Sequence, residues 1–288
     1  FKKARRTSPA SSVAFFPGTE KGQRKVIKLI ALDLDDTLLM PDGTIPEGVA
    51  ETLREAERRG VGIVIATGRS YPSAKIYAEI LGSECPVICY NGAVIRRAGQ
   101  PPLYSASLSV GLMKRIAFFC RERGLYLQMY DEDHIVVDKI CESTLIDPDS
   151  KVTGIREIGD LTKAELRPSP KMMILDDPEK IPAIRRDLET LLGDQLYMAK
   201  SKEYLLEMMP KDVSKQKALI RFAQSLEIRR EEVMACGDNT NDIEMLEWAG
   251  LGVAVANAVP ELKNGADYVA EARRSFGVAE AVKKFVLA

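Results

Sequence analysis

Acidic residues follow the first strongly apolar segment of the chain. Residues 26–32 (VIKLIAL) are almost all apolar, and the sequence DLDDTL follows at 33–38. Carboxylates at positions i and i+2 of an extended backbone, here Asp33 and Asp35, project to the same side and can share a cation. Ending an apolar strand in acids costs free energy unless they meet a metal ion or solvent. The alternative interpretation of this piece alone is a polar turn that closes the strand.

Two further clusters have residue types that suit the binding of an anion. Thr67-Gly68-Arg69 ends a second apolar run, and a hydroxyl with loop amides at such a place can hold an oxyanion. Lys215 begins a helical pattern, where a cation opposes the helix dipole unless an anion is bound. Taken singly, the first is also a good strand-to-helix turn and the second is also an ordinary solvated lysine.

A fourth cluster, CGDNTND at 236–242, follows a short apolar run. Its glycine allows the backbone to approach a ligand closely, and Asp238 and Asp242 offer oxygen ligands. The alternative is an Asx-rich cap for the following helix, to which Asn241 contributes.

Alternating strands and helices place these clusters at one edge of a sheet. Strands are predicted at 26–32, 61–66, 87–90, 233–236 and 251–256, and helices at 44–59 (capped by Thr44), 72–81, 214–226, 242–249, from 260 and from 276. The apolar strands are typical of a parallel sheet covered on both faces, so the pattern predicts a doubly wound α/β core. The carboxyl ends of its strands would bring the four clusters together.

A different pattern separates the two halves of this core. Helices are predicted at 109–123 and at 178–192 (capped by Asp177), and each is followed by two strands, at 125–130 and 135–138 and at 195–199 and 204–208. Two helix-strand-strand units indicate an α+β domain on an antiparallel sheet. We therefore expect an insert at 92–210 and a core made of 26–91 and 211–288.

Composition excludes several classes of protein. The chain has 288 residues with 41 basic and 42 acidic side chains, a balance that argues against a nucleic-acid surface, and no apolar run approaches a membrane span. One histidine, His134, leaves no room for multi-histidine metal sites. The five cysteines are odd in number and scattered, as in a reduced cytoplasmic protein. Residues 1–25, with seven basic residues and one acid, are expected to be a mobile extension.

The order DLDDTL, TGR, VSK and GDNTND resembles the four motifs of the haloacid dehalogenase-like phosphohydrolases. Longer strings resemble the Cof-type branch, and they are CYNGAVI at 89–95, PKDVSKQKAL at 210–219, GDNTNDIEML at 237–246 and VANAVPELKNGADYV at 255–269. The similarity runs from about residue 26 to the end of the chain. Asp36 is a departure, because many members have glycine there. In this branch an α/β cap is inserted between the second and third motifs.

The resemblance implies a role for each motif residue. Asp33 would be the nucleophile and Asp35 the general acid and base, and Mg²⁺ would be held by Asp33, the backbone carbonyl of Asp35 and Asp238. The residues implied to hold the phosphoryl oxygens are Thr67 and Lys215, assisted by Asn241 and by the amides of Leu34 and Gly68. Asp242 would orient Lys215 or a metal-bound water, with Asn239 in the same loop. Asn91 is either a turn residue with Gly92 or a contact at the domain junction.

The expected function is therefore Mg²⁺-dependent hydrolysis of a small phosphorylated metabolite, such as a sugar phosphate, through an aspartyl-phosphate. A phosphomutase and a phosphatase for one defined, sucrose-phosphate-like substrate are the alternatives within the family. A non-catalytic regulator that binds a phosphorylated metabolite is the alternative outside it, although binding alone would not require both Asp33 and Asp35. Specificity is expected to come from the insert, where His134 is either a plain surface residue or a substrate contact. No nucleic acid or membrane is expected as a partner, and the sequence leaves the oligomeric state open.

Overall fold

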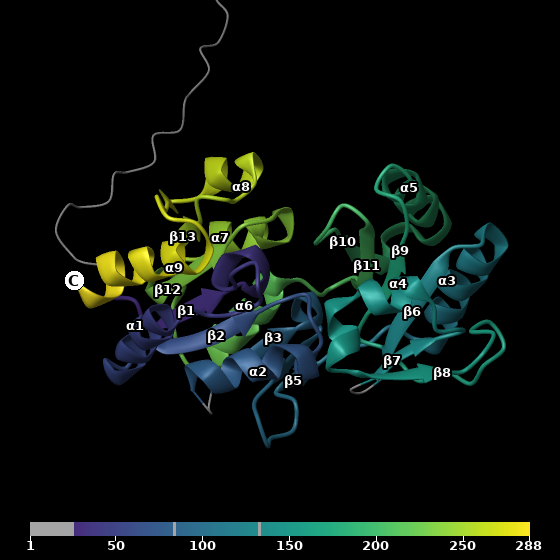
Figure 1. The fold of residues 1–288 in the computed structure, drawn as a ribbon, viewed down its shortest axis with the longest axis horizontal. Coiled ribbons are helices and arrows are strands. Elements are labelled where there is room, and N and C mark those ends of the chain that lie inside the picture. Colours follow the sequence, from purple (N-terminus) through teal and green to yellow (C-terminus); the bar gives the residue numbers. More distant parts are fainter. Residues whose placement is uncertain (1–25, 83–84, 132–133) are drawn as a thin grey trace, which may run out of the picture.

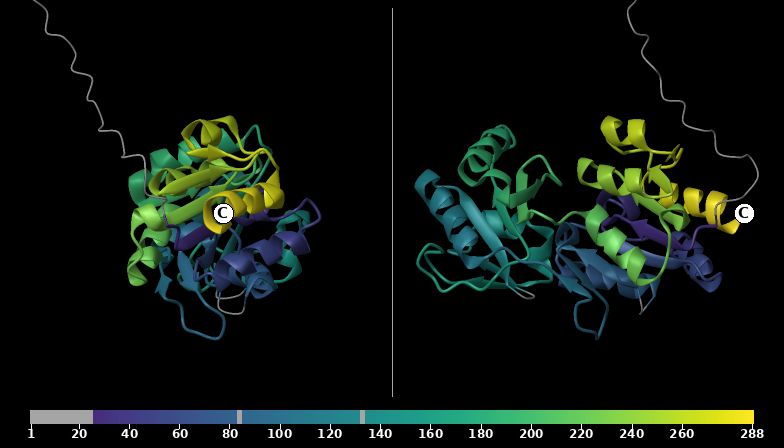
Figure 2. Two further views of the ribbon diagram at one scale, coloured as in Figure 1. Left: turned by 90° about the vertical axis from the view of Figure 1, so that its left-hand side faces the viewer. Right: turned by 180° about the vertical axis from the view of Figure 1, so that it is seen from behind.

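The computed structural model describes residues 26–82, 85–131 and 134–288, so the extension predicted over 1–25 lies outside the described residues. Two sheets lie one after the other along the longest axis of the molecule (Figure 1). The right-hand view of Figure 2 shows the same separation from behind, with the second sheet and its helices at one end. None of the helices in the described part of the chain combines the length and apolar character that crossing a bilayer requires.

The first sheet has the order β14-β13-β12-β1-β2-β3-β4-β5. Its strands are β1 (Leu29–Leu32), β2 (Gly62–Ala66), β3 (Val87–Cys89), β4 (Val94–Arg96), β5 (Tyr104–Ser105), β12 (Val233–Gly237), β13 (Leu251–Ala254) and β14 (Tyr268–Val269). The run from β14 to β3 is parallel, and β4 and β5 add an antiparallel edge. Since β12, β1 and β2 are neighbours, the polar clusters that follow them lie at adjacent points of one edge.

Helices cover the first sheet in two groups. They are α1 (Glu47–Arg58), α2 (Tyr71–Leu81), α6 (Lys215–Ser225), α7 (Ile243–Trp248), α8 (Pro260–Gly265) and α9 (Arg274–Val282). The first two pack together with α9, and α6, α7 and α8 form a second contacting series, as a doubly wound fold requires. The cap predicted for α1 was wrong: the Thr44 hydroxyl donates to Asp42 at 2.7 Å, and the residue before the helix is Pro46.

The second sheet, with its three helices, is called the cap below. Its order is β10-β11-β9-β6-β7-β8, antiparallel except for the parallel pair β7 and β8. Its elements are α3 (Val110–Arg123), β6 (Tyr126–Asp131), β7 (His134–Val137), α4 (Glu142–Ile146), β8 (Gly154–Glu157), β9 (Met172–Leu175), α5 (Ile181–Leu192), β10 (Leu196–Ala199) and β11 (Leu205–Pro210). Strands β8 and β9 and helix α4 were not predicted from the sequence. The helix predicted from residue 178 begins at Ile181, because Asp177 accepts from the Glu179 amide in a turn before the helix.

The predicted start of the insert at residue 92 falls inside the first sheet. Strand β4 pairs with β3, and β5 pairs with β4, so the chain enters the cap only after Ser105. The physical reason is burial: Ile95 is 2% exposed and joins the core cluster of the first sheet. No strand was predicted at β4 or β5, because strands of three and two residues are too short to show a periodic pattern.

The two faces of the cap sheet have different partners. Alternate residues Met172, Ile174, Leu206 and Met208 pack in one cluster with the apolar faces of α3 and α5. The residues between them, such as Met173 and Glu207, point to the opposite face, since side chains alternate along a strand. That opposite face lines a recess beside the first sheet, which puts cap side chains next to the polar clusters.

Candidate active site

A buried lysine joins two of the clusters. Lys215 is the first residue of α6, after the N-cap Ser214, and its Nζ donates to Asp33 Oδ1 at 2.6 Å and to Asp242 Oδ1 at 2.7 Å. Asp33 directly follows β1, and all three side chains are buried. The charges of Asp242 and Asp33 outweigh burial and raise the pKa of Lys215 far above its usual range, so the site holds a permanent cation.

Three carboxylates surround that cation. Oxygens of Asp33, Asp238 and Asp242 lie within 4.8 Å of one another. Burial, followed by the neighbouring acids, raises the pKa of Asp238 to about 7 and that of Asp33 well above its ordinary value, although Lys215 opposes the second shift. When all three carboxylates are ionised, their negative charge exceeds the positive charge of the Lys215 ammonium by two. This is the charge of one divalent ion, and an all-oxygen donor set suits Mg²⁺, so the residues fit the predicted metal.

The loop after β12 brings its own acids into place. Oδ2 of Asp242 accepts from the backbone amides of Asp238 and Asn239, each at 3.1 Å. A Cβ at Gly237 would come within 2.6 Å of the Asp242 Cβ, so only glycine permits this approach. Both oxygens of Asp242 are thus occupied by protein donors, and Asp238 accepts from the Thr37 hydroxyl at 2.9 Å.

Asp35 is held by an arginine that the pattern analysis did not name as a site residue. The Arg69 guanidinium binds Asp35 with two hydrogen bonds, Nη2 to Oδ1 at 2.6 Å and Nε to Oδ2 at 2.9 Å. Burial raises the pKa of Asp35, but these bonds and the arginine charge outweigh it, so the pKa lies below its ordinary value. Arg69 belongs to the TGR cluster, two residues after Thr67, and this position in a predicted anion-binding motif could have indicated it as a site residue.

The remaining predicted residues lie around this centre. Thr67 is buried, and its Oγ1 accepts from the Arg69 amide at 3.2 Å. Asn91 is a contact at the junction, since it accepts from Asn241 Nδ2 at 3.3 Å and donates to Glu207 at 3.0 Å. Its neighbour Gly92 has φ +104, and a Cβ there would meet the Ser214 carbonyl at 2.2 Å.

Other predicted residues complete the same edge of the sheet. Asn239 donates to the carbonyl of Ser201, so it ties the cap to the loop after β12. Leu34 is buried beside Asp33, and Gly68 lines the recess. The recess is thus lined by predicted residues of three motifs, and Lys215 of the fourth is bound to Asp33 beside it; these lining residues are Asp33, Asp35, Thr67, Gly68, Asp238, Asn239 and Asn241.

The cap side of the recess was not predicted residue by residue. The acids Asp147, Asp149 and Glu207 and the lysines Lys171 and Lys202 line it opposite Asp33 and Asp35. Glu207 and Lys171 are single charges in or beside apolar strands (LLEMM and KMMIL), and a buried charge of that kind requires a partner. His134 pairs with Gly154 of β8 and is not among the residues that line the recess.

Comparison with known proteins agrees with this geometry. Residues 30–282 match the family described as haloacid dehalogenase-like hydrolase. The chain belongs to this family. A putative phosphatase, YxeH of Bacillus subtilis, is 32% identical over 91% of this chain and 99% of its own. A second protein of that organism, the 5-amino-6-(5-phospho-D-ribitylamino)uracil phosphatase YitU, is 28% identical over 89% and 97%.

Solved structures show the same architecture. A sugar phosphatase of subclass IIB of this superfamily, BT4131, superposes with a TM-score of 0.77 at 26% identity, covering 91% of this chain and 100% of its own. The predicted family, the α/β core with a cap and the assignment as a phosphatase are confirmed. Asp36 stands where many members of the family have glycine. Its φ of 61 is a conformation that glycine favours, and Arg274 binds its carboxylate at 2.6 Å.

Proposed function

We propose that the protein is a Mg²⁺-dependent phosphatase that hydrolyses a small phosphorylated metabolite, such as a sugar phosphate, through an aspartyl-phosphate on Asp33. The observation that carries the proposal is the buried Asp33 carboxylate, bound by Lys215 at 2.6 Å within a group of three acids. A buried charged carboxylate is costly, and a mere binding site for an anion would not place one where the phosphate must sit. A nucleophile explains its position.

The proposed reaction has two chemical steps. An Asp33 oxygen attacks phosphorus, the bond from phosphorus to the leaving oxygen breaks, and Asp35 gives that oxygen a proton. Water then attacks the phosphorus, Asp35 takes the proton of the water, and Asp33 is regenerated with release of inorganic phosphate. A phosphate dianion beside Asp35 competes for Arg69 and favours the protonated carboxyl that the first step needs.

Charge neutralisation is the second requirement of phosphoryl transfer. Lys215 and the Thr67 hydroxyl would bind the phosphoryl oxygens, with Asn241 and the amides of Leu34 and Gly68. The oxygens of Asp33 and Asp238, with the backbone carbonyl of Asp35, would hold Mg²⁺, which supplies positive charge to the phosphoryl group. Asp242 keeps Lys215 in place rather than binding the metal, because both of its oxygens already accept hydrogen bonds.

The recess supports a small hydroxylated leaving group. Its cavity volume is about 70 Å³, below the roughly 300–1,000 Å³ typical of small-molecule sites, so with the cap in this position the recess has room only for a small group. Its cap side carries carboxylates and lysines rather than a continuous apolar wall. The names of the two related enzymes, a 5-amino-6-(5-phospho-D-ribitylamino)uracil phosphatase and a sugar phosphatase, support a small phosphorylated metabolite as substrate.

The test is release of inorganic phosphate from a panel of phosphorylated metabolites, with Mg²⁺ and with EDTA, in three proteins. The wild type should act only with the metal, and Asp33→Asn should lose activity by at least the ~10²–10⁴-fold associated with acid–base groups. Asp36→Asn is the matched control, because its carboxylate binds Arg274 instead, and it should stay within a few-fold of wild type. A folded Asp33→Asn protein with wild-type turnover would refute the mechanism. Transfer of phosphate between positions of the substrate, without release, would identify a mutase instead.

A further inference from the structure

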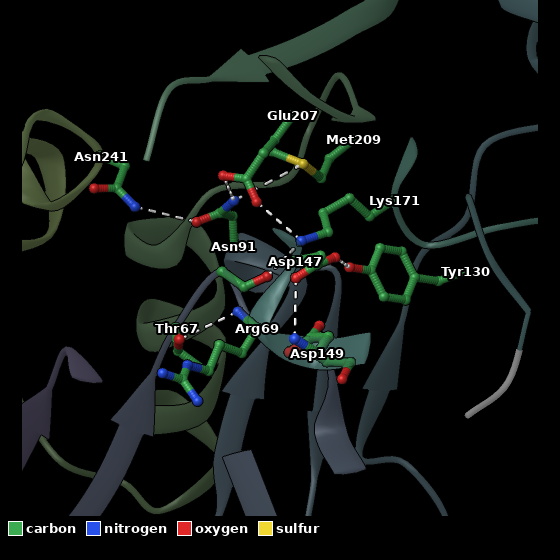
Figure 3. A network of polar contacts seen from close by, with 12 residues as sticks. Thr67, Arg69, Asn91, Tyr130, Asp147, Asp149, Lys171, Glu207, Met209 and Asn241 are labelled. Carbon is green, nitrogen blue, oxygen red and sulfur yellow. Dashed lines mark hydrogen bonds and ion pairs between the residues drawn. The ribbon is translucent and has the colours of Figure 1, made fainter. Parts of the chain in front are cut away.

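The cap holds the catalytic loop after β2 at two backbone groups. Lys171, just before β9, donates from Nζ to the carbonyl of Gly68 at 2.8 Å. The amide of Ser70 donates to Asp149 Oδ2, also at 2.8 Å. These contacts lie on either side of Arg69, the residue that binds Asp35. The cap therefore fixes the segment that supplies the Thr67 hydroxyl and the Arg69 side chain (Figure 3).

Lys171 has two of its three donors bound within the protein. Its ammonium also donates to Glu207 Oε1 at 2.9 Å, and the Tyr130 ring centroid lies 4.8 Å from it. Both charged side chains are 3% exposed. Glu207 is occupied too, since its Oε2 accepts from Asn91. A buried ion pair adds little net stability by itself, so its position against Gly68 calls for another explanation.

The contact with Gly68 is transmitted through one rigid peptide group. The carbonyl of Gly68 and the amide of Arg69 belong to the same planar unit, so fixing one fixes the other. That amide donates to Thr67 Oγ1 at 3.2 Å, which leaves the hydroxyl proton free to point at a phosphoryl oxygen. A Cβ at Gly68 would lie 3.3 Å from Glu207 Oε1, so the loop backbone and the ion pair are in direct contact.

From these contacts we propose that Lys171 is a positioning residue, which makes the geometry of Thr67, Arg69 and Asp35 depend on a docked cap. The proposal rests on the proposed phosphatase function and adds to it that the cap is needed for chemistry, not only for reading the leaving group. A substrate that makes few contacts with the cap should then still depend on Lys171.

The test compares kcat and KM for 4-nitrophenyl phosphate in the full-length protein with Mg²⁺. Lys171→Met should lower kcat roughly 10- to 100-fold, the loss expected when catalytic groups are misplaced by about 1 Å, with little change in KM. Lys171→Arg keeps the cation and the donors and should recover part of the loss. The double variant Lys171→Met with Glu207→Gln removes the unpaired buried acid and should show the same low kcat, which keeps the test valid if the single variant folds poorly.

Lys114→Met is the matched control. This half-buried cap lysine donates to the carbonyls of Leu161, Thr162 and Ala164 and takes part in no described contact with the first sheet, so its loss should leave kcat unchanged. The proposal is overturned if folded Lys171 variants turn over the aryl phosphate within about twofold of wild type. It is equally overturned if only KM for metabolites rises, since Lys171 would then read the leaving group. Failure of the phosphatase function itself is distinguishable, because Asp33→Asn would then retain the wild-type rate.

Discussion

Replacing Lys215 by methionine should destabilise the first sheet and its helices more than any surface change. The side chain is 1% exposed and bonds Asp33 at 2.6 Å and Asp242 at 2.7 Å. Methionine fills a similar volume but leaves both carboxylates buried without a counter-charge. Breaking a buried pair in this way costs roughly 3–5 kcal/mol, a large part of the ~5–15 kcal/mol that stabilises a domain.

This loss should be measured as a melting temperature in EDTA. For a chain of this size, a loss of 1 kcal/mol lowers the Tm by roughly 2–4 °C, so Lys215→Met should melt about 6–20 °C below wild type. Lys217→Met is the matched control on the same helix, because its pair with Asp212 spans 3.4 Å between exposed side chains. Exposed pairs contribute about 0–1 kcal/mol, so the control should melt within a few degrees of wild type.

Addition of Mg²⁺ separates electrostatics from packing. With the carboxylates ionised, the site of the variant has one more uncompensated negative charge than that of the wild type, so Mg²⁺ should raise the Tm of the variant by more than it raises that of wild type. Binding of vanadate should be lost in the same protein, since the cation that would hold it is gone. The buried charges are not what stabilises this site if Lys215→Met and Lys217→Met have the same Tm, or if Mg²⁺ raises the Tm of Lys215→Met and of wild type equally.

Three other predictions follow from the same contacts. In EDTA the folded protein should become less stable as pH rises between 3.8 and about 7. Burial, then Asp242, raises the pKa of Asp238, so in this range the folded state holds a proton that the unfolded chain has released. Mg²⁺ should reduce this dependence of Tm on pH, and melting temperatures that rise with pH in EDTA would contradict the prediction. A thiol reagent should modify Cys141 quickly and the four buried cysteines only after unfolding, as counted by thiol titration; two or more fast thiols would disprove this arrangement. The cap can be exchanged for a related one, joined near residues 107 and 210. This exchange should change the ratio between kcat/KM for the best metabolite and kcat/KM for an aryl phosphate. An active chimera that keeps the native substrate ranking would show that the first sheet sets specificity.

The motifs could be located from the sequence because each is short and follows an apolar strand. Asp33, Thr67 and Asp238 come directly after residues whose pattern predicts a strand, and parallel strands carry their carboxyl ends to one edge. The pattern around Lys215 left open whether this lysine meets an anion or is solvated, and in the structure it is buried and binds Asp33, 182 residues away. The cap was recognisable as a separate antiparallel unit, although the predicted start at residue 92 precedes β4 and β5, which are too short to be predicted from a pattern and pair with the first sheet.

What the sequence determined by itself is the local chemistry: which side chains end each strand, and in which order along the chain. What only the tertiary structure decided is the set of pairs across the two sheets. Lys171 and Gly68 are 103 residues apart, and no periodicity in either segment indicates the other. A strand pattern gives the face on which a residue lies, but the partner of a buried charge depends on how the two sheets pack against each other. For that reason the coupling of the cap to the catalytic loop could be found only in three dimensions.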